Sequence, residues 1–151
     1  MKQRKSTPKT LRADARLLVE NCAGWNSRLA ARRITQFLDR ELAGTGLSTA
    51  QLGLLALIAT IADDTLGALA ERAGLEQSTL SRNLRTLDAA GLIEIATVEA
   101  DLRRRAVWLT EAGALQLEAA LPVWRKAQRC LGRHVSPQLA RQLAFAAEAL
   151  S

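Results

Sequence analysis

Three consecutive arginines, residues 103–105, lie between the acidic residues Glu99 and Asp101 and the apolar run AVWL. A guanidinium group is permanently charged, and its planar set of donors matches the oxygens of phosphate groups. A narrow minor groove in A·T-rich DNA concentrates negative potential and attracts an inserted arginine. The row therefore indicates contact with nucleic acid at an exposed tip, and the alternative is that it serves solubility alone.

A second group of candidate contact residues lies in QSTLSRNLRTLDAA, residues 77–90. Helical spacing predicts an inward stripe of Leu80, Leu84 and Leu87. The residues pointing away or flanking that stripe are Ser78, Thr79, Ser81, Arg82 and Arg85. Arginine can bind guanine O6 and N7 together, and hydroxyls near a helix start can bind phosphate with the free N–H groups. We therefore predict a DNA-recognition helix, with an ordinary solvated helix face as the alternative.

The elements around these residues have the pattern of a helix-turn-helix. The segment TLGALAERA, residues 65–73, predicts a short helix that ends at Gly74, and the second helix follows from residue 77. Two short helices joined by a turn that contains glycine are typical of this motif.

A β-hairpin is predicted directly after the second helix. Residues 92–98 and 105–109 have strand-like composition and are joined by the polar loop 99–104. Two strands alone are marginally stable, so the hairpin must pack on the helices. Helix-turn-helix and hairpin together predict a winged helix.

Longer helical segments flank this centre. Residues 10–43 are helix-compatible, and Ser48 with Gln51 forms a capping-box pattern before a helix that is apolar nearly all round. Thr110 caps a further long helix, and Ser136 followed by proline begins the last one.

The predicted fold is mainly α with a small β-hairpin, a winged helix-turn-helix flanked by N- and C-terminal dimerisation helices. We expect a basic tail without fixed structure over residues 1–9, a helical dimerisation region over 10–47 and 111–151, and a DNA-binding domain over 48–110. The terminal helices carry more apolar surface than so small a lobe could cover, which favours a two-fold dimer. A monomer with its termini folded back on one core is the alternative.

Composition agrees with an anionic partner. The net charge is +6, the isoelectric point is near 10.3, and 17 of the 21 basic residues are arginine. Residues 1–40 carry ten basic and three acidic side chains, a local charge of +7, whereas residues 76–105 carry five of each. Nucleic acid is the first candidate partner and an anionic membrane surface the second.

Several function classes are disfavoured. One histidine and two distant cysteines predict no metal site and no cofactor, and no catalytic set of serine, histidine and acid or of paired carboxylates can be assembled. We therefore predict that the chain is not an enzyme. The N-terminus lacks the apolar core of a signal peptide and the longest apolar run is too short for a bilayer, so we expect no membrane partner and a cytoplasmic location.

Three segments resemble the MarR (multiple antibiotic resistance regulator) family of bacterial transcription factors. They are GLSTAQLGLL at 46–55, LGALAERAGLEQSTLSRNLRTLDAAGLI at 66–93 and DLRRRAVWLTEAG at 101–113, within a match over roughly 22–129. The resemblance implies a dimeric winged-helix repressor or activator that releases DNA when a small ligand binds or a cysteine is oxidised.

The resemblance also implies roles in the wing. Arg103, two residues after Asp101, takes the place of the family's groove-reading arginine, and Asp101 supports it because a carboxylate near phosphates is repelled. We predict a phosphate contact for Arg104, whereas Arg105 begins the return strand and serves the fold. Where the family carries arginines in the first strand, this sequence has Ile95 and Ala96.

Two further site hypotheses come from the family. Cys22 and Cys130 are candidate redox thiols that could approach each other within or between chains, although the chain lacks the tyrosines that assist such cysteines in relatives. Their alternative role is packing. Trp25 and His134 are candidates for lining an effector pocket, with core or interface packing as the alternative.

The predicted function is that of a homodimeric repressor, bound to a pseudo-palindromic operator in double-stranded DNA and released by a small aromatic or other apolar effector. One alternative is a thiol-based redox-sensing regulator using Cys22 and Cys130. Another is a winged-helix interaction module with weak DNA binding, which the near-neutral segment 76–105 and the altered first strand favour.

Overall fold

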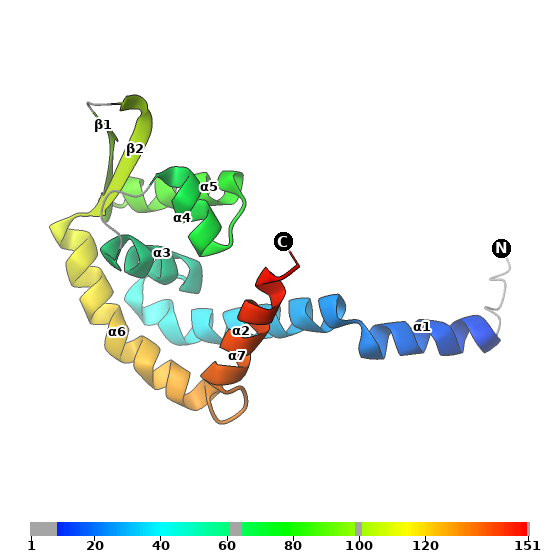
Figure 1. Ribbon diagram of the computed structural model, residues 1–151. Helices are drawn as coiled ribbons and strands as arrows, with labels where there is room; N and C mark the ends of the chain where they lie inside the picture. The colour runs from blue at the N-terminus through cyan, green and yellow to red at the C-terminus, as the bar shows by residue number, and fades with distance from the viewer. Residues whose placement is uncertain (1–8, 61–64, 99–100, 151) are drawn as a thin grey trace, which may run out of the picture. The chain divides into compact units, whose positions relative to one another are not determined.

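The computed structural model describes residues 9–60, 65–98 and 101–150, with the backbone alone at residues 98 and 101–104. The chain divides into two compact units, one ending at Phe37 and the other beginning at Leu38. In chain order the elements are α1 (Lys9–Asn21), α2 (Ala23–Leu42), the 3-10 turn η1 (Ala43–Thr45), α3 (Thr49–Thr60), α4 (Leu66–Ala73), α5 (Gln77–Ala89), β1 (Ile93–Val98), β2 (Asp101–Leu109), α6 (Glu111–Leu131) and α7 (Pro137–Glu148) (Figure 1).

The first unit contains α1 and most of α2, where the sequence predicts one continuous helical stretch. The stretch is instead broken at Cys22. The side-chain amide of Asn26 donates to the Glu20 carbonyl at 3.0 Å, and that of Asn21 donates to the Leu17 carbonyl at 2.9 Å. These side chains satisfy carbonyls at the end of α1, which a continuous helix would satisfy with its own N–H groups.

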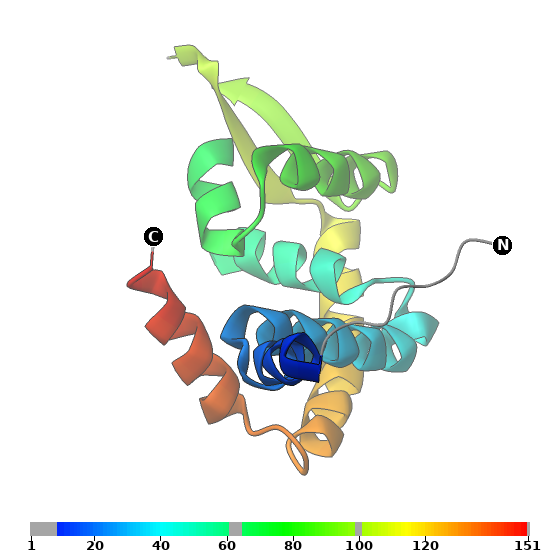
Figure 2. The same cartoon turned by 90° about the vertical axis from the view of Figure 1, so that its right-hand side faces the viewer.

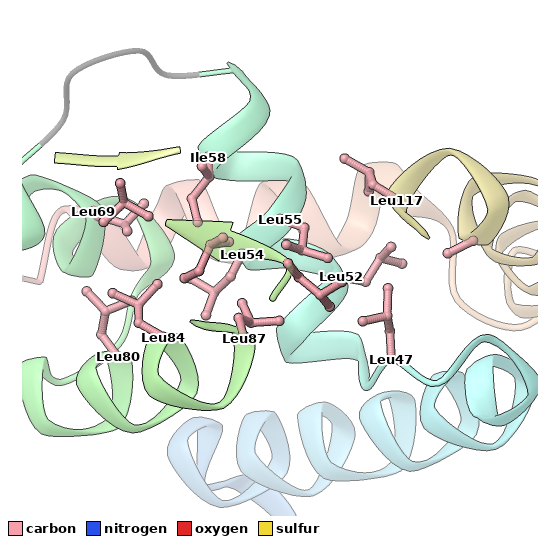
Figure 3. Packing of buried hydrophobic residues seen from close by; sticks show 14 of the residues in the cluster. Leu47, Leu52, Leu54, Leu55, Ile58, Leu69, Leu80, Leu84, Leu87 and Leu117 are labelled. Carbon is pink, nitrogen blue, oxygen red and sulfur yellow. The ribbon is translucent and has the colours of Figure 1, made fainter. Parts of the chain in front are cut away.

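The second unit has a core made of leucines from every helix of the winged lobe (Figure 3). The helix that the sequence makes apolar nearly all round is α3, and its Leu52, Leu54, Leu55 and Ile58 are all buried. The wing joins the same cluster through Ile93 and Val107, together with leucines of α4, α5 and α6. The helices therefore stabilise the two strands, which would be only marginally stable on their own.

Several predicted helix starts are present as hydrogen-bonded caps. The Gln51 N–H donates to the Ser48 hydroxyl at 3.2 Å, and the Ser48 N–H donates back to Gln51 Oε1 at 2.9 Å. The Thr110 hydroxyl accepts from Gly113 N–H at 3.0 Å, and the Ser136 hydroxyl accepts from Leu139 N–H at 3.2 Å. Each of these caps satisfies a backbone donor that the first helical turn leaves without a partner.

The terminal helices differ from this lobe, because their large apolar side chains are exposed. No residue of α1 or α7 is buried. Leu143 is 53% exposed, Phe145 75% and Leu150 88%.

Within the described ranges, no single helix is both long and apolar enough to span a membrane; only a bent pair, 23–45 with 49–60, meets that test by length and composition.

Candidate nucleic-acid interface

The α5 helix presents a polar face to solvent and a leucine stripe to the core. Leu80, Leu84 and Leu87 are at most 2% exposed, which confirms the predicted inward stripe. On the opposite side Ser78, Arg82 and Arg85 are exposed, while Thr79 and Ser81 are half-buried at its flanks. The burial of three leucines fixes the rotation of α5, so the two arginines must face outward.

The turn before α5 depends on a left-handed glycine. Gly74 has a φ of 62°, and its N–H donates to carbonyls of the last turn of α4. Leu75 N–H also donates to the Ala70 carbonyl at 3.0 Å, and the Leu75 side chain packs on the core. This α4 ending turns the chain sharply, and α5 begins three residues after Gly74.

The wing is a regular two-stranded antiparallel hairpin near its base. Ile93 pairs with Leu109, Ile95 with Val107 and Thr97 with Arg105, and an irregularity follows between Thr97 and Val98. The predicted loop over 99–104 is wrong for residues 101–104, because they belong to β2. Antiparallel pairing continues to Val98 and Asp101. Charged residues are common on exposed edge strands, so the polar composition of residues 101–104 does not exclude a strand.

The wing is tied to α5 and α6 at its base by Thr110. The Thr110 hydroxyl donates to the Gly91 carbonyl at 2.6 Å while it caps α6, and the Thr110 N–H donates to the Leu92 carbonyl at 3.1 Å. A Cβ at Gly113 would lie 1.9 Å from the Leu92 oxygen, so only glycine lets α6 approach this backbone. The sequence Leu-Thr-x-x-Gly, residues 109–113, thus positions the wing relative to α5 and α6.

Sequence reasoning missed a side-chain contact on the outer face of the wing. The Trp108 indole N–H donates to Glu94 Oε2 at 3.0 Å, and the two residues are direct partners across the hairpin. The contact could have been predicted only from the register of the hairpin, which places a tryptophan directly opposite an acidic residue on the neighbouring strand.

The other predicted site residues are more dispersed. The side chains of Asp101, Arg103 and Arg104 lie outside the described residues, and only their place in β2 is given. Cys22 is half-buried between α1 and α2, where its sulfur accepts the Trp25 N–H at 3.4 Å, and Cys130 is exposed near the end of α6. The two thiols belong to different units.

The proposed pocket residues are likewise in different units. Trp25 is 56% exposed and lines a depression of about 120 Å³ on α2 with Arg28, Leu29 and Arg32. His134 is exposed in the turn after α6. Across the described residues there is also no group of three histidine, cysteine or acidic side chains that could hold a metal ion.

The hairpin that follows the second helix of a helix-turn-helix, and packs on the same core, defines a winged helix-turn-helix protein. A MarR-family sequence model matches residues 45–104, which run from the end of η1 into β2 of the wing. The chain belongs to the MarR family of transcriptional regulators.

Solved structures give the same result over most of the chain. The M. tuberculosis transcriptional regulator MosR, in a complex with DNA, is 35% identical with a TM-score of 0.78, and the match covers 86% of this chain and 96% of MosR. A MarR-family regulator from Silicibacter pomeroyi is 28% identical with a TM-score of 0.64, covering 90% and 92%. A probable transcriptional regulator from Pseudomonas aeruginosa is 25% identical with a TM-score of 0.73, covering 88% and 99%. A comparison with curated proteins finds no match.

Proposed function

We propose that this chain represses transcription as a sequence-specific DNA-binding homodimer that a small ligand releases from its operator. The observation that carries this proposal is the outer face of α5, where two exposed arginines and several hydroxyls stand opposite a fully buried leucine stripe and beside a wing. The similarity to MosR, whose structure was solved in a complex with DNA, supports the same partner.

The reading contacts are assigned to α5. Arg82 and Arg85 are free to reach base edges in the major groove, where an arginine pair with guanine contributes about 1–3 kcal/mol of discrimination. Ser78, Thr79 and Ser81 lie in the first turns of the helix. The Glu76 side chain makes no capping hydrogen bond there, so the first N–H groups are available to a phosphate together with the hydroxyls.

The wing supplies the second set of contacts. Arg103 is proposed to enter the neighbouring minor groove, Arg104 to contact a phosphate, and Asp101 to hold Arg103 in place. These roles follow from their position in the outer part of β2, next to the hairpin tip.

The dimer is proposed to form through the terminal helices. Large apolar side chains are exposed on α1 (Leu11, Leu17, Leu18, Val19) and on α7 (Leu139, Leu143, Phe145). Exposed apolar surface of this extent on two helices is typical of an interface between subunits. A two-fold dimer presents two copies of α5, so its operator is a pseudo-palindrome with half-sites about one helical turn apart.

The effector is proposed to be a small aromatic or other apolar molecule. The depression lined by Trp25 and Leu29 offers an aromatic surface, and Arg28 and Arg32 at its margin suit a ligand that carries a negative charge. Binding there would act on α2, which continues from the first unit into the second.

A DNA-shift titration tests the proposal. The probe is the promoter duplex next to the chain's own gene, and the competitor is a scrambled duplex of equal length and composition. We expect saturable binding of the promoter at a protein concentration at least about a hundredfold below that needed for the scrambled duplex. Equal binding of the two duplexes would contradict sequence-specific regulation and favour the interaction module.

The variant Arg82→Ala separates reading from general attraction. We expect it to lose the preference for the promoter while it keeps its oligomeric state in sedimentation. The matched control is Arg125→Ala, which removes the same charge from the exposed side of α6 and should leave the preference unchanged. If Arg82→Ala binds the promoter as selectively as the parent chain, the assigned reading face is wrong.

A further inference from the structure

We propose that Arg105 contacts a DNA phosphate from the face of the wing that lies on the same side as the helices of the lobe. This role rests on the proposed DNA-binding function and replaces the purely structural role that the sequence predicts for Arg105. It adds a contact at the middle of the hairpin, between the reading helix and the tip residues.

The register of the hairpin determines the face on which Arg105 lies. Successive side chains of a strand alternate between its two faces, so every second pair of partners shares a face. The pairs Ile93 with Leu109 and Ile95 with Val107 pack on the core, and all four side chains are buried or half-buried. The next pair on that face is Thr97 with Arg105. The irregularity begins only after Thr97, so it does not change this assignment.

Although it shares a face with core residues, Arg105 is exposed. The hairpin projects beyond the layer formed by α4 and α5 in both views (Figures 1 and 2). Two residues of strand advance the chain by about 6.6 Å, which carries the Arg105 pair past the Val107 pair that the helices cover. Within the described residues, the Arg105 guanidinium has no hydrogen bond or ion pair. Arg105 therefore places an exposed cation on the same face of the hairpin as the residues that pack on the core.

Among the described side chains of the hairpin, the two charged ones lie on different faces, Glu94 on the outer face and Arg105 on the inner face. On the outer face Glu94 is exposed and accepts the indole hydrogen bond of Trp108, which keeps the carboxylate on that side. On the inner face the charge is Arg105, and in the same lobe the solvent face of α5 carries Arg82 and Arg85. A polyanion is attracted by Arg105, Arg82 and Arg85 and repelled by Glu94. When α5 lies in a DNA groove, the phosphate backbone that borders the groove passes next to the wing. Phosphate contacts of this kind fix the position and orientation of the protein on the duplex without reading its sequence.

The test compares relocated charges in the full chain. Arg105→Ala removes the cation, R105A/T97R returns it to the same face on the directly opposite strand, and R105A/A106R places it one residue away on the outer face. Ala106 is the direct partner of Ala96 across the hairpin. Each double variant removes one arginine and adds another on the same hairpin, so both keep the net charge of the parent chain. Thermal unfolding followed by circular dichroism verifies that each variant is folded. Affinity is measured by fluorescence anisotropy for a promoter duplex and for a scrambled duplex between 50 and 200 mM KCl.

We expect Arg105→Ala to weaken both duplexes by the same factor, at least about tenfold at 50 mM KCl. Each lost phosphate contact makes the slope of log affinity against log salt concentration shallower by about 0.9. A dimer loses two contacts, so its slope should become shallower by about 1.8. Between 50 and 200 mM KCl, the affinity of the variant should therefore fall by a factor about tenfold smaller than that of the parent chain. R105A/T97R should restore the slope and R105A/A106R should not.

Two results would overturn the inference. The first is an unchanged salt slope in Arg105→Ala while the parent chain still prefers its promoter, which would leave the proposed function standing. The second is equal rescue by both double variants, which would mean that net charge alone matters. Conversely, a parent chain without sequence preference, whose slope still falls on Arg105→Ala, would contradict the proposed function and keep the phosphate contact.

Discussion

The winged lobe and the terminal helices are similar in composition and opposite in burial. Leu84 of α5 is 2% exposed and Leu87 is fully buried, whereas Leu139 and Leu143 of α7 are 58% and 53% exposed. Both sets recur at helical spacing, so sequence pattern alone does not separate them. The difference shows that the lobe completes its own core within one chain, while α1 and α7 contribute no buried residue.

The largest expected effect lies in the lobe. Leu84→Ala removes a side chain that is enclosed by the core and should lower the free energy of unfolding by about 2–5 kcal/mol. Chemical denaturation followed by circular dichroism measures this loss. The matched control is Leu150→Ala beyond the end of α7, where the leucine is 88% exposed and the free energy should be nearly unchanged. Equal losses in the two variants would remove the distinction between the regions.

The next effect concerns assembly rather than folding. The double variant L139S/L143S makes the apolar side of α7 polar and should weaken the dimer by at least about tenfold, because burying each leucine contributes about 1.5–3 kcal/mol. Sedimentation velocity over a concentration series measures the shift toward monomer. The control Gln142→Ser changes the same exposed helix without removing an apolar group and should sediment like the parent. A parent chain that is already monomeric at every concentration would contradict the proposed dimer.

A smaller effect is expected where the wing meets α6. Gly113→Ala should destabilise the lobe by about 1–3 kcal/mol, because its Cβ would lie 1.9 Å from the Leu92 carbonyl oxygen and backbone must move. It should also displace the wing and weaken DNA binding. Gly53→Ala, in α3, is the comparison, since nothing lies within 4 Å of the added Cβ. If both variants unfold at the same denaturant concentration, the close approach at Gly113 is not a constraint.

The smallest effects compare two helix caps of the same type. Thr110→Ala removes the cap of α6 and the hydrogen bond to Gly91, so it should lower the stability of the lobe by about 1 kcal/mol. Ser136→Ala removes the cap of α7 and should shift the main unfolding transition by less than about 0.5 kcal/mol, because α7 buries no residue in the core. Differential scanning calorimetry at low protein concentration measures both. A larger loss at Ser136 would show that α7 stabilises the monomer.

Much of the lobe was predictable because its signals are local. The spacing of Leu80, Leu84 and Leu87 and the Ser48–Gln51 capping box depend only on residues within one or two helical turns, and the structure confirms them. The break at Cys22 was not predicted, since it depends on how the Asn21 and Asn26 side chains compete for backbone carbonyls. The start of β2 at Asp101 was missed as well, because polar composition resembled a loop and only strand pairing shows otherwise.

By itself, the sequence determined the order of the elements, the inward stripe of α5 and the presence of a wing, because periodicity, caps and glycine stops act over short distances. Tertiary structure alone decided which apolar helices are covered, how Gly113 meets the Leu92 backbone and where Arg105 stands. These outcomes depend on contacts between residues far apart in the chain. For Arg105 the alternation of the strand assigns a face shared with core residues, but only the structure shows that this arginine is exposed.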